Sequence, residues 1–246
     1  YWGVPLIAKG NILGVLEVFR RRPGDEDVNW TNFLNTLASQ AAIAIADTQL
    51  FTDLQRANLD LRLAYEATIE GWARAMEMHD KETEGHSRRV VEMTMLLAQH
   101  LNVSPEDLPH IRRGTLLHDI GKMAVPDEIL FKKGELTEEE WEIMREHPTQ
   151  AYEMLKEINY LQPALEIPLC HHEKWDGSGY PRGLKGDQIP LAARIFAIVD
   201  VYDALISERP YRPAHSKQDA LTYIREQSGK HFDPRVVEAF LKAIAV

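Results

Sequence analysis

The sequence has 246 residues, 44% hydrophobic and 27% charged, which is the balance of an ordinary globular protein and excludes a disordered or collagen-like chain. No apolar run is long enough to span a membrane, no signal peptide opens the chain, and a single cysteine predicts a reducing, cytoplasmic location without an internal disulfide. The net charge of −10 argues against binding to nucleic-acid polymers. Because the sequence begins with Tyr1, we expect it to be part of a longer protein.

The first thirty residues predict a β-hairpin, followed by a long helix. Apolar runs at residues 4–8 and 12–20 are separated by Lys9-Gly10-Asn11, which is a turn signal. Residues 30–79 contain no proline, and only Gly71 interrupts their helical pattern. We therefore expect a small β segment that leads into one continuous helix.

Within that helix, apolar residues recur with alternating spacings of four and three. The stripe consists of Leu50, Leu54, Ala57, Leu61 and Ala64. Such an a/d pattern is typical of a helix that packs along one seam. Two interpretations remain open: the stripe faces the core of its own chain, or it pairs with a second copy as a parallel coiled coil and makes a homodimer.

The rest of the chain is predicted to be helical, so the fold class is mainly α. Ser104 is the expected N-cap of a helix with Pro105 at its first position. Thr137 and Glu140 fit a capping box. Residues 175–186 contain four glycines and are expected to form a loop.

The ten histidines are the unusual feature, since several stand beside acidic residues within apolar segments. His118-Asp119 follows two leucines, and Asp200 lies inside the apolar run 195–201. A carboxylate is costly to bury unless it is paired or bound to a metal. Imidazoles and carboxylates suit Mn, Fe, Ni or Zn, and an adjacent His-Asp pair offers one terminal and one bridging ligand for a two-metal site. We treat His79-Asp80 as a chance pair.

The acidic and histidine residues fall into an ordered series of motifs. In chain order these are Glu84 to Val90, His118-Asp119-Ile120-Gly121-Lys122, His147-Pro148, His171 to Pro181 with its Gly179-Tyr180-Pro181, Asp200 to Leu205, and Arg209 to Arg212. With this series, residues 80–245 resemble an HD-GYP domain, the bacterial phosphodiesterase branch of the HD hydrolase superfamily. The resemblance implies an HD-type helical bundle that hydrolyses cyclic di-GMP to the linear dinucleotide or to GMP.

The resemblance also implies a metal centre of two or three divalent transition metal ions, with Fe or Mn favoured and Ni or Zn compatible. The implied ligands are Glu82, His86, His118, Asp119, His147, His171, His172 and Asp200. Asp119 is expected to bridge two ions, and Glu82 marks the subtype with three. Catalytic roles fall to Asp119 and Lys122, and the implied substrate contacts are Tyr180, Arg209 and Arg212.

Residues 4–18 and 37–46 resemble the end of a GAF sensory domain. We therefore expect a partial GAF domain at 1–50, a connecting helix at 51–79 and an HD-GYP phosphodiesterase domain at 80–246, regulated by a signal from the GAF side. Two alternative functions remain: a catalytically degenerate module that binds cyclic dinucleotides as a scaffold, and another nucleotide phosphohydrolase of the HD superfamily. The mixed GMP–AMP cyclic dinucleotide remains an alternative substrate.

Overall fold

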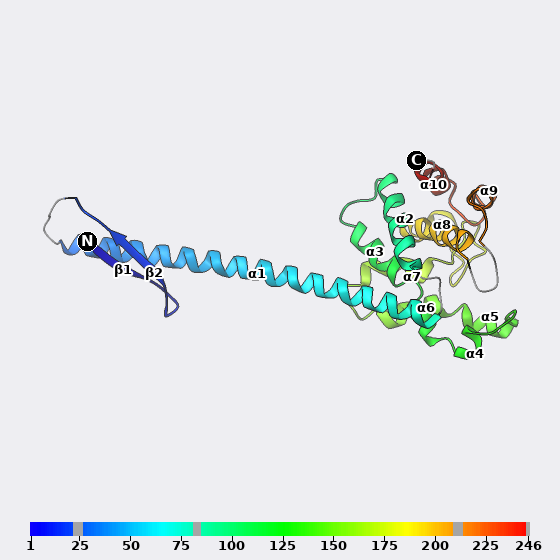
Figure 1. The fold of residues 1–246 in the computed structure, drawn as a ribbon, viewed down its shortest axis with the longest axis horizontal. Helices are drawn as coiled ribbons and strands as arrows, with labels where there is room; N and C mark the ends of the chain where they lie inside the picture. Colours follow the sequence, from blue (N-terminus) through cyan, green and yellow to red (C-terminus); the bar gives the residue numbers. More distant parts are fainter. Residues whose placement is uncertain (22–26, 81–84, 209–213, 245–246) are drawn as a thin grey trace. The chain divides into compact units, whose positions relative to one another are not determined.

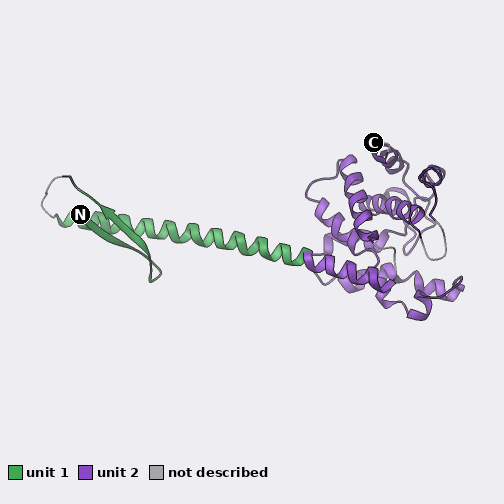
Figure 2. Ribbon diagram, in the orientation of Figure 1, with its two compact units in different colours: residues 1–66 green, residues 67–246 purple. Residues whose placement is uncertain are grey.

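The computed structural model describes residues 1–21, 27–80, 85–208 and 214–244. Contacts between residues divide the chain into two compact units, residues 1–66 and residues 67–246 (Figure 2). The predicted substrate contacts Arg209 and Arg212 and the predicted ligand Glu82 lie outside the described residues.

The first unit opens with the predicted hairpin. Strands β1 (Trp2–Ala8) and β2 (Asn11–Val18) pair antiparallel and are joined by Lys9 and Gly10. Both turn residues have positive φ, 48° and 82°, as the tight two-residue turns of hairpins require. The β segment expected from the sequence is therefore confirmed.

Helix α1 (Val28–Asp80) is one continuous helix of 53 residues, and its first turns lie along the hairpin (Figure 1). Trp2 of β1 meets the ring of Trp30 edge to face, with 6.2 Å between ring centroids. One stripe of α1 is buried at four-residue intervals, at Leu34, Ala38 and Ala42. The hairpin and this stripe form the small core of the first unit.

The apolar stripe between Leu50 and Ala64 does not pack against the described part of its own chain. Leu50, Leu54 and Leu61 are 59%, 65% and 53% exposed. The interpretation that these residues face an internal core is therefore wrong for the described residues.

The second unit is a bundle of helices that includes the last turns of α1. Its further elements are α2 (His86–His100), α3 (Leu108–Leu116), η1 (Ile120–Ala124), α4 (Asp127–Leu130), α5 (Glu138–Met144), α6 (His147–Leu155), η2 (Gln162–Ala164), α7 (Glu166–Cys170), η3 (Gly186–Gln188), α8 (Leu191–Ile206), α9 (Lys217–Glu226) and α10 (Pro234–Ile244). The predicted mainly helical fold is thus confirmed. Over the described ranges, none of these helices combines the length and the apolar character that crossing a membrane requires.

The core of the bundle is built around α8, which carries an almost unbroken apolar sequence. Its Phe196 and Ile198 are fully buried, together with Val90 of α2 and Val236 and Phe240 of α10. A helix that is apolar on most sides must be covered on most sides, and α8 packs against α2, α7, α9 and α10. Asp200 is therefore carried by a helix that is mostly buried, while its own side chain remains 25% exposed.

The two predicted helix starts had different outcomes. Thr137 caps α5 as expected: its side chain accepts the Glu140 N–H while the Glu140 side chain accepts the Thr137 N–H. The start at Pro105 was wrong, because α3 begins at Leu108. Ser104 accepts the Glu106 N–H in a preceding turn instead, which uses its capping oxygen before the helix starts.

Candidate metal centre

Seven of the predicted ligands lie at the ends or middles of different elements, which bring them together. His86 opens α2, His118 and Asp119 stand between α3 and η1, and His147 opens α6. His171 and His172 follow α7, and Asp200 lies within α8. Their donor atoms form two groups, each within 4.8 Å: Asp119 with His147, His171 and His172, and His118 with His86 and Asp200.

Asp119 faces both groups with different oxygens. Its Oδ1 lies 3.4 Å from His147 Nε2 and 3.7 Å from His171 Nε2, whereas its Oδ2 lies 3.0 Å from His118 Nε2. His86 Nε2 in turn lies 3.7 Å from Asp200 Oδ1. A carboxylate in this arrangement can contact two cations at once, as a bridging ligand of a two-metal site does.

Gly121 permits this approach. A side chain at Gly121 would collide with the backbone carbonyl of His147, and its Cβ would come within 2.8 Å of the His147 carbonyl carbon. Glycine therefore lets η1 lie directly on the first turn of α6. The glycine of the His-Asp motif thus brings Asp119 beside His147.

Each of three histidines uses Nδ1 to bind a backbone carbonyl, which fixes its tautomer. His118 Nδ1 lies 2.8 Å from the Thr115 oxygen, His147 Nδ1 2.8 Å from the Met144 oxygen, and His171 Nδ1 3.0 Å from the Pro168 oxygen. Because a carbonyl only accepts hydrogen bonds, Nδ1 carries the proton, and Nε2 of the neutral ring presents a lone pair. This is the arrangement that metal-ligating histidines use.

The histidines of the Asp119 group are held neutral. Burial lowers the pKa of His147, and burial together with neighbouring imidazoles lowers the pKa of His171 well below its usual range and that of His172 to about 3. His147 Nε2 and His171 Nε2 nevertheless lie 3.3 Å apart, lone pair toward lone pair. Such a pair is unfavourable without an electrophile nearby, so the donor set fits divalent transition metal ions.

In the second donor group, neighbouring carboxylates favour the protonated form of His118. Burial disfavours the cation of His118, but Asp119 and Asp200 outweigh burial and raise the pKa of His118 to about 9. Burial likewise opposes ionisation of Asp119, yet His118 and Lys122 hold the pKa of Asp119 well below its usual range. A divalent ion that binds here must displace the His118 proton, so metal binding releases protons.

Lys122, predicted to have a catalytic role, lies beside Asp119. Its Nζ lies 2.6 Å from Asp119 Oδ2, and its side chain is 16% exposed. Because Asp119 is the N-cap of η1 and Lys122 lies three residues later in its first turn, the ammonium stays beside the carboxylate. Lys122 is therefore in position to meet an anion that approaches Asp119.

Tyr180, a predicted substrate contact, lies against the ligand group. Its ring stacks on His172 with 4.7 Å between centroids. Gly179 precedes it, and a Cβ there would lie 2.5 Å from both the Glu173 Cα and the His172 oxygen. Glu173, 2% exposed, accepts the N–H groups of Arg182 at 2.8 Å and Leu184 at 2.9 Å, which ties the loop to the residue after the ligands.

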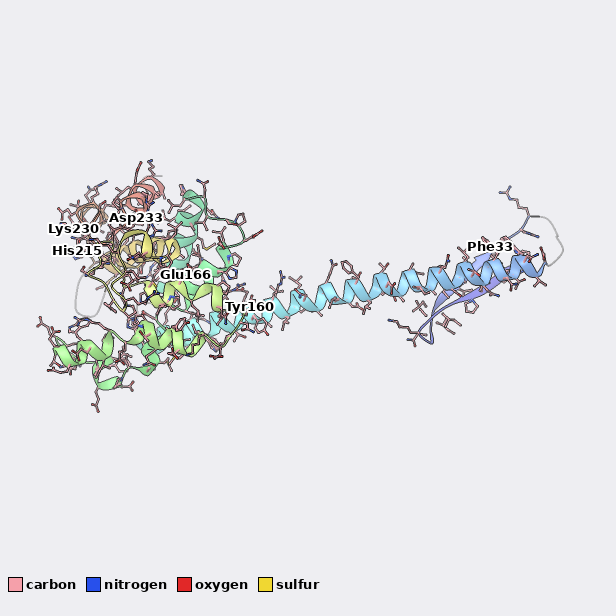
Figure 3. The ribbon with its side chains drawn as sticks, turned by 180° about the vertical axis from the view of Figure 1, so that it is seen from behind. Phe33, Tyr160, Glu166, His215, Lys230 and Asp233 are labelled. Carbon is pink, nitrogen blue, oxygen red and sulfur yellow. The ribbon has the colours of Figure 1, made fainter. Side chains whose placement is uncertain are left out.

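The far side of the same loop is anchored by charge. Asp233, labelled in Figure 3, directly precedes α10 and accepts from Arg194 Nη1 at 2.6 Å. Arg194 also donates to Asp187 at 2.9 Å, and its guanidinium lies over the Trp175 ring at 5.7 Å from the centroid. These contacts hold residues 175–188 against α8 and α10, so the loop that carries Tyr180 is fixed at both ends.

Asp203 is a residue of the site to which the sequence argument assigned no role. It is fully buried in α8, and its Oδ2 accepts from His86 Nδ1 at 2.8 Å. Arg89 donates to the same carboxylate at 2.6 and 2.9 Å. Burial raises the pKa of Asp203, but the bonds from His86 and Arg89 outweigh it and lower that pKa to about 2. The sequence could have indicated this residue because Asp203 lies three residues after Asp200, which places both carboxylates on one face of a helix.

A sequence model of the HD domain family matches residues 72–236, and a model of the GAF domain family matches residues 1–45. The chain belongs to the HD domain family. These matches, with the relatives described below, confirm the predicted HD-GYP branch preceded by a GAF-like segment.

Relatives within the HD family include two cyclic dinucleotide phosphodiesterases. The cyclic di-GMP phosphodiesterase response regulator RpfG of Xanthomonas campestris is 44% identical over 180 residues, 72% of this chain and 48% of that protein. The 3'3'-cGAMP-specific phosphodiesterase 2 of Vibrio cholerae is 39% identical over 186 residues, 75% of this chain and 36% of that protein. The chain thus spans about half the length, or less, of these curated relatives.

A solved structure shares the fold. The crystal structure of a cyclic GMP-AMP specific phosphodiesterase of Vibrio cholerae has a TM-score of 0.58 at 22% identity, over 72% of this chain and 48% of that chain. At this level of identity the likeness concerns the HD fold, which agrees with the predicted helical bundle.

Proposed function

We propose that this chain is a metal-dependent phosphodiesterase that hydrolyses cyclic di-GMP to the linear dinucleotide or to GMP. The observation that carries the proposal is the convergence of seven histidine and aspartate donors into two groups, with Asp119 facing both. Relatives at 44% and 39% identity are named as cyclic dinucleotide phosphodiesterases.

Each donor group would hold one divalent ion, with Fe or Mn favoured and Ni or Zn compatible with the ligands. Ions bound there would polarise the phosphodiester and lower the pKa of water near neutrality. Glu82 would add a carboxylate for a third ion. Two divalent ions would bring four positive charges against the two negative charges of Asp119 and Asp200, so the site suits a polyanionic substrate although the whole chain is acidic.

The side chains around the ligands have separate proposed roles. The Lys122 ammonium binds a phosphate oxygen or the departing ribose oxygen beside Asp119. Tyr180, held on His172, contacts a base or phosphate. Arg209 and Arg212 bind the phosphates, for which a guanidinium is suited because it donates two parallel hydrogen bonds.

The geometry of the site also bears on the two alternative functions. A degenerate binding module would have lost ligands, whereas all seven described donors are present and oriented. A different HD-family phosphohydrolase would not need the Tyr180 loop, which here is anchored through Glu173. The mixed cyclic GMP–AMP dinucleotide remains the competing substrate because several relatives are named for it.

The proposed organisation keeps a partial GAF domain at 1–50, a connecting helix at 51–79 and a phosphodiesterase domain at 80–246. Signals from the GAF side would reach the site through α1, and the exposed stripe from Leu50 to Ala64 would join two copies. The single cysteine supports a cytoplasmic location.

The deciding experiment measures turnover on protein purified without oxygen and loaded separately with Mn²⁺ or Fe²⁺. We expect cyclic di-GMP to be hydrolysed by the loaded protein and not by Asp119→Ala, which retains its helical circular dichroism. Chromatography of the products distinguishes the linear dinucleotide from GMP. Binding of cyclic di-GMP without turnover by the loaded wild type would favour the scaffold function, and faster turnover of cyclic GMP–AMP would reassign the substrate.

A further inference from the structure

The last turns of α1 contribute side chains to the wall of the metal centre. Met76, Glu77 and Asp80 share the lining of a small cavity with the ligands His118 and Asp119. All of these residues belong to the second unit, so the contact lies within one compact body. The helix that begins at Val28 thus ends beside the candidate site.

Asp80 is linked to Asp119 through Lys122. Asp80 Oδ2 accepts from Lys122 Nζ at 3.3 Å, and that ammonium lies 2.6 Å from Asp119 Oδ2. The side chain of Asp80 is 4% exposed, so the carboxylate has left bulk water to make its contacts. An ammonium that is held between two carboxylates divides its interaction between them.

A second carboxylate of α1 contacts the element that carries another ligand. Glu77 Oε1 accepts the backbone N–H of Ser87 at 2.7 Å, in the first turn of α2. His86, which opens this helix, is the neighbouring residue. The end of α1 is therefore joined to both sides of the centre, to η1 through Asp80 and to α2 through Glu77.

The Lys122 ammonium competes with a divalent ion for Asp119. The oxygen that it contacts, Oδ2, also lies 3.0 Å from His118 Nε2 and so belongs to the side of Asp119 that faces the second donor group. Two cations near one carboxylate oxygen repel each other. Because Asp80 attracts the Lys122 ammonium, the ammonium neutralises less of the negative charge of Asp119. More of that charge is then available to a bound metal ion.

We propose that Asp80 is a positioning residue that shares the Lys122 ammonium with Asp119, draws it partly away from the metal-binding oxygen Oδ2, and so couples the end of α1 to metal affinity and turnover. This inference rests on the proposed metal-dependent function. A shift of the last turn of α1 relative to η1 would move Asp80 from Lys122 and weaken the centre. The helix therefore supplies a direct route by which an upstream change reaches the reaction.

The test is a double-mutant cycle on Mn²⁺ affinity, measured by calorimetric titration of the full chain without substrate. We expect Asp80→Asn to weaken binding about tenfold, within the range for residues that orient metal ligands. Lys122→Met should bind Mn²⁺ at least as tightly as the wild type because the competing ammonium is gone. The double variant should bind like Lys122→Met, since Asp80 then has no ammonium to hold.

The matched control is Asp60→Asn, an exposed carboxylate farther along the same helix, which should leave Mn²⁺ affinity and turnover unchanged. Asp80→Glu keeps the charge and should retain affinity within about threefold of the wild type. If Asp80→Asn does not fold, the comparison of Lys122→Met with the double variant still decides, because neither contains the buried ammonium.

An equal loss on Asp80→Asn in the wild-type and Lys122→Met backgrounds would overturn the proposal, since Asp80 would then act by its charge alone. Unchanged affinity in Asp80→Asn would overturn it as well.

In the turnover assay we expect Asp80→Asn at saturating Mn²⁺ to lower kcat more than it changes KM. Because the titration needs no substrate, absence of cyclic di-GMP hydrolysis by the wild type would overturn the proposed function and leave this test intact.

Discussion

The histidines of the centre are oriented by acceptors outside the ligand set. Backbone carbonyls hold His118, His147 and His171 through Nδ1, and Asp203 holds His86 in the same way. The rings are thereby fixed with Nε2 inward before any ion arrives, which lowers the entropy that metal binding must overcome. Among these acceptors, Asp203 is the one side chain, so a substitution can remove it and test its role.

The low pKa of Asp203 makes it a source of pH-dependent stability. A carboxylate whose folded pKa is about 2 and whose ordinary pKa is 3.8 stabilises the fold above about pH 4 and loses that effect as the pH falls toward 2. We expect Asp203→Asn to lower the unfolding free energy of metal-free protein by about 2 kcal/mol at pH 7. Urea unfolding between pH 7 and pH 3 measures this difference, which should shrink below pH 4, whereas Asp60→Asn should show none. A difference that stayed constant with pH would contradict the prediction.

Glu82 carries the prediction of a third metal ion. Removal of its carboxylate in Glu82→Ala should lower the bound metal by one equivalent per chain, because the third ion loses a charged ligand. Metal analysis by mass spectrometry after anaerobic loading measures the stoichiometry. Glu92→Ala, which removes a carboxylate that is 63% exposed on α2, is the matched control. Equal stoichiometry in wild type and Glu82→Ala would limit the centre to two ions.

At the scale of elements, glycine decides how closely two segments approach. The loop that carries Tyr180 passes so near to the backbone of residues 172–174 that a side chain at Gly179 does not fit. The loop is also held by Glu173 and by the charges of Asp233 and Arg194. A substitution at Gly179 therefore displaces Tyr180 while the helices beneath remain in place.

Gly179→Ala should lower kcat/KM for cyclic di-GMP by about a hundredfold, since a displacement of about 1 Å near the reacting groups has this effect. Helical circular dichroism should stay unchanged because the loop lies outside the helices, and metal analysis checks that His172, whose backbone oxygen the added carbon meets, still binds its ion. Gly71→Ala is the control: its nearest neighbour, the Arg74 side chain, lies 4.0 Å from the added carbon, and alanine favours a helix. Full activity of Gly179→Ala would show that the loop does not position substrate.

At the scale of the whole molecule, the exposed stripe of α1 predicts the oligomeric state. Exposed leucines in an a/d pattern lose contact with water when two such helices pair. We expect the wild type to sediment as a dimer and Leu54→Glu combined with Leu61→Glu to sediment as a monomer at the same concentration. Leu59→Glu changes an exposed leucine off the stripe and should leave the dimer intact. A monomeric wild type at high concentration would contradict the pairing.

The motif series named seven donor residues that the structure brings together, whereas it did not indicate their surroundings. His147 and Asp200 could be assigned because a motif series preserves residue type and order. Three residues of the surroundings act through partners that only tertiary packing brings close. The packing of α8 on α2 joins Asp203 to His86, the packing of the loop on α7 joins Glu173 to Arg182, and the packing of α1 on η1 joins Asp80 to Lys122. Asp80 was treated as part of a chance pair because its partner, Lys122, is 42 residues away. Such contacts depend on tertiary structure, which a local pattern does not encode.

The donors of the centre are spread along the chain from His86 to Asp200, on segments that are neighbours only in the folded state. An unfolded chain presents them far apart, so an ion that binds the folded form shifts the folding equilibrium by mass action, by about 2.7 kcal/mol at a hundredfold excess over its dissociation constant. Supply of the divalent ion would then govern how long the protein survives proteolysis as well as how fast it works. Starvation for the metal would lower the number of folded molecules and, under the proposed function, would slow the removal of the cyclic dinucleotide.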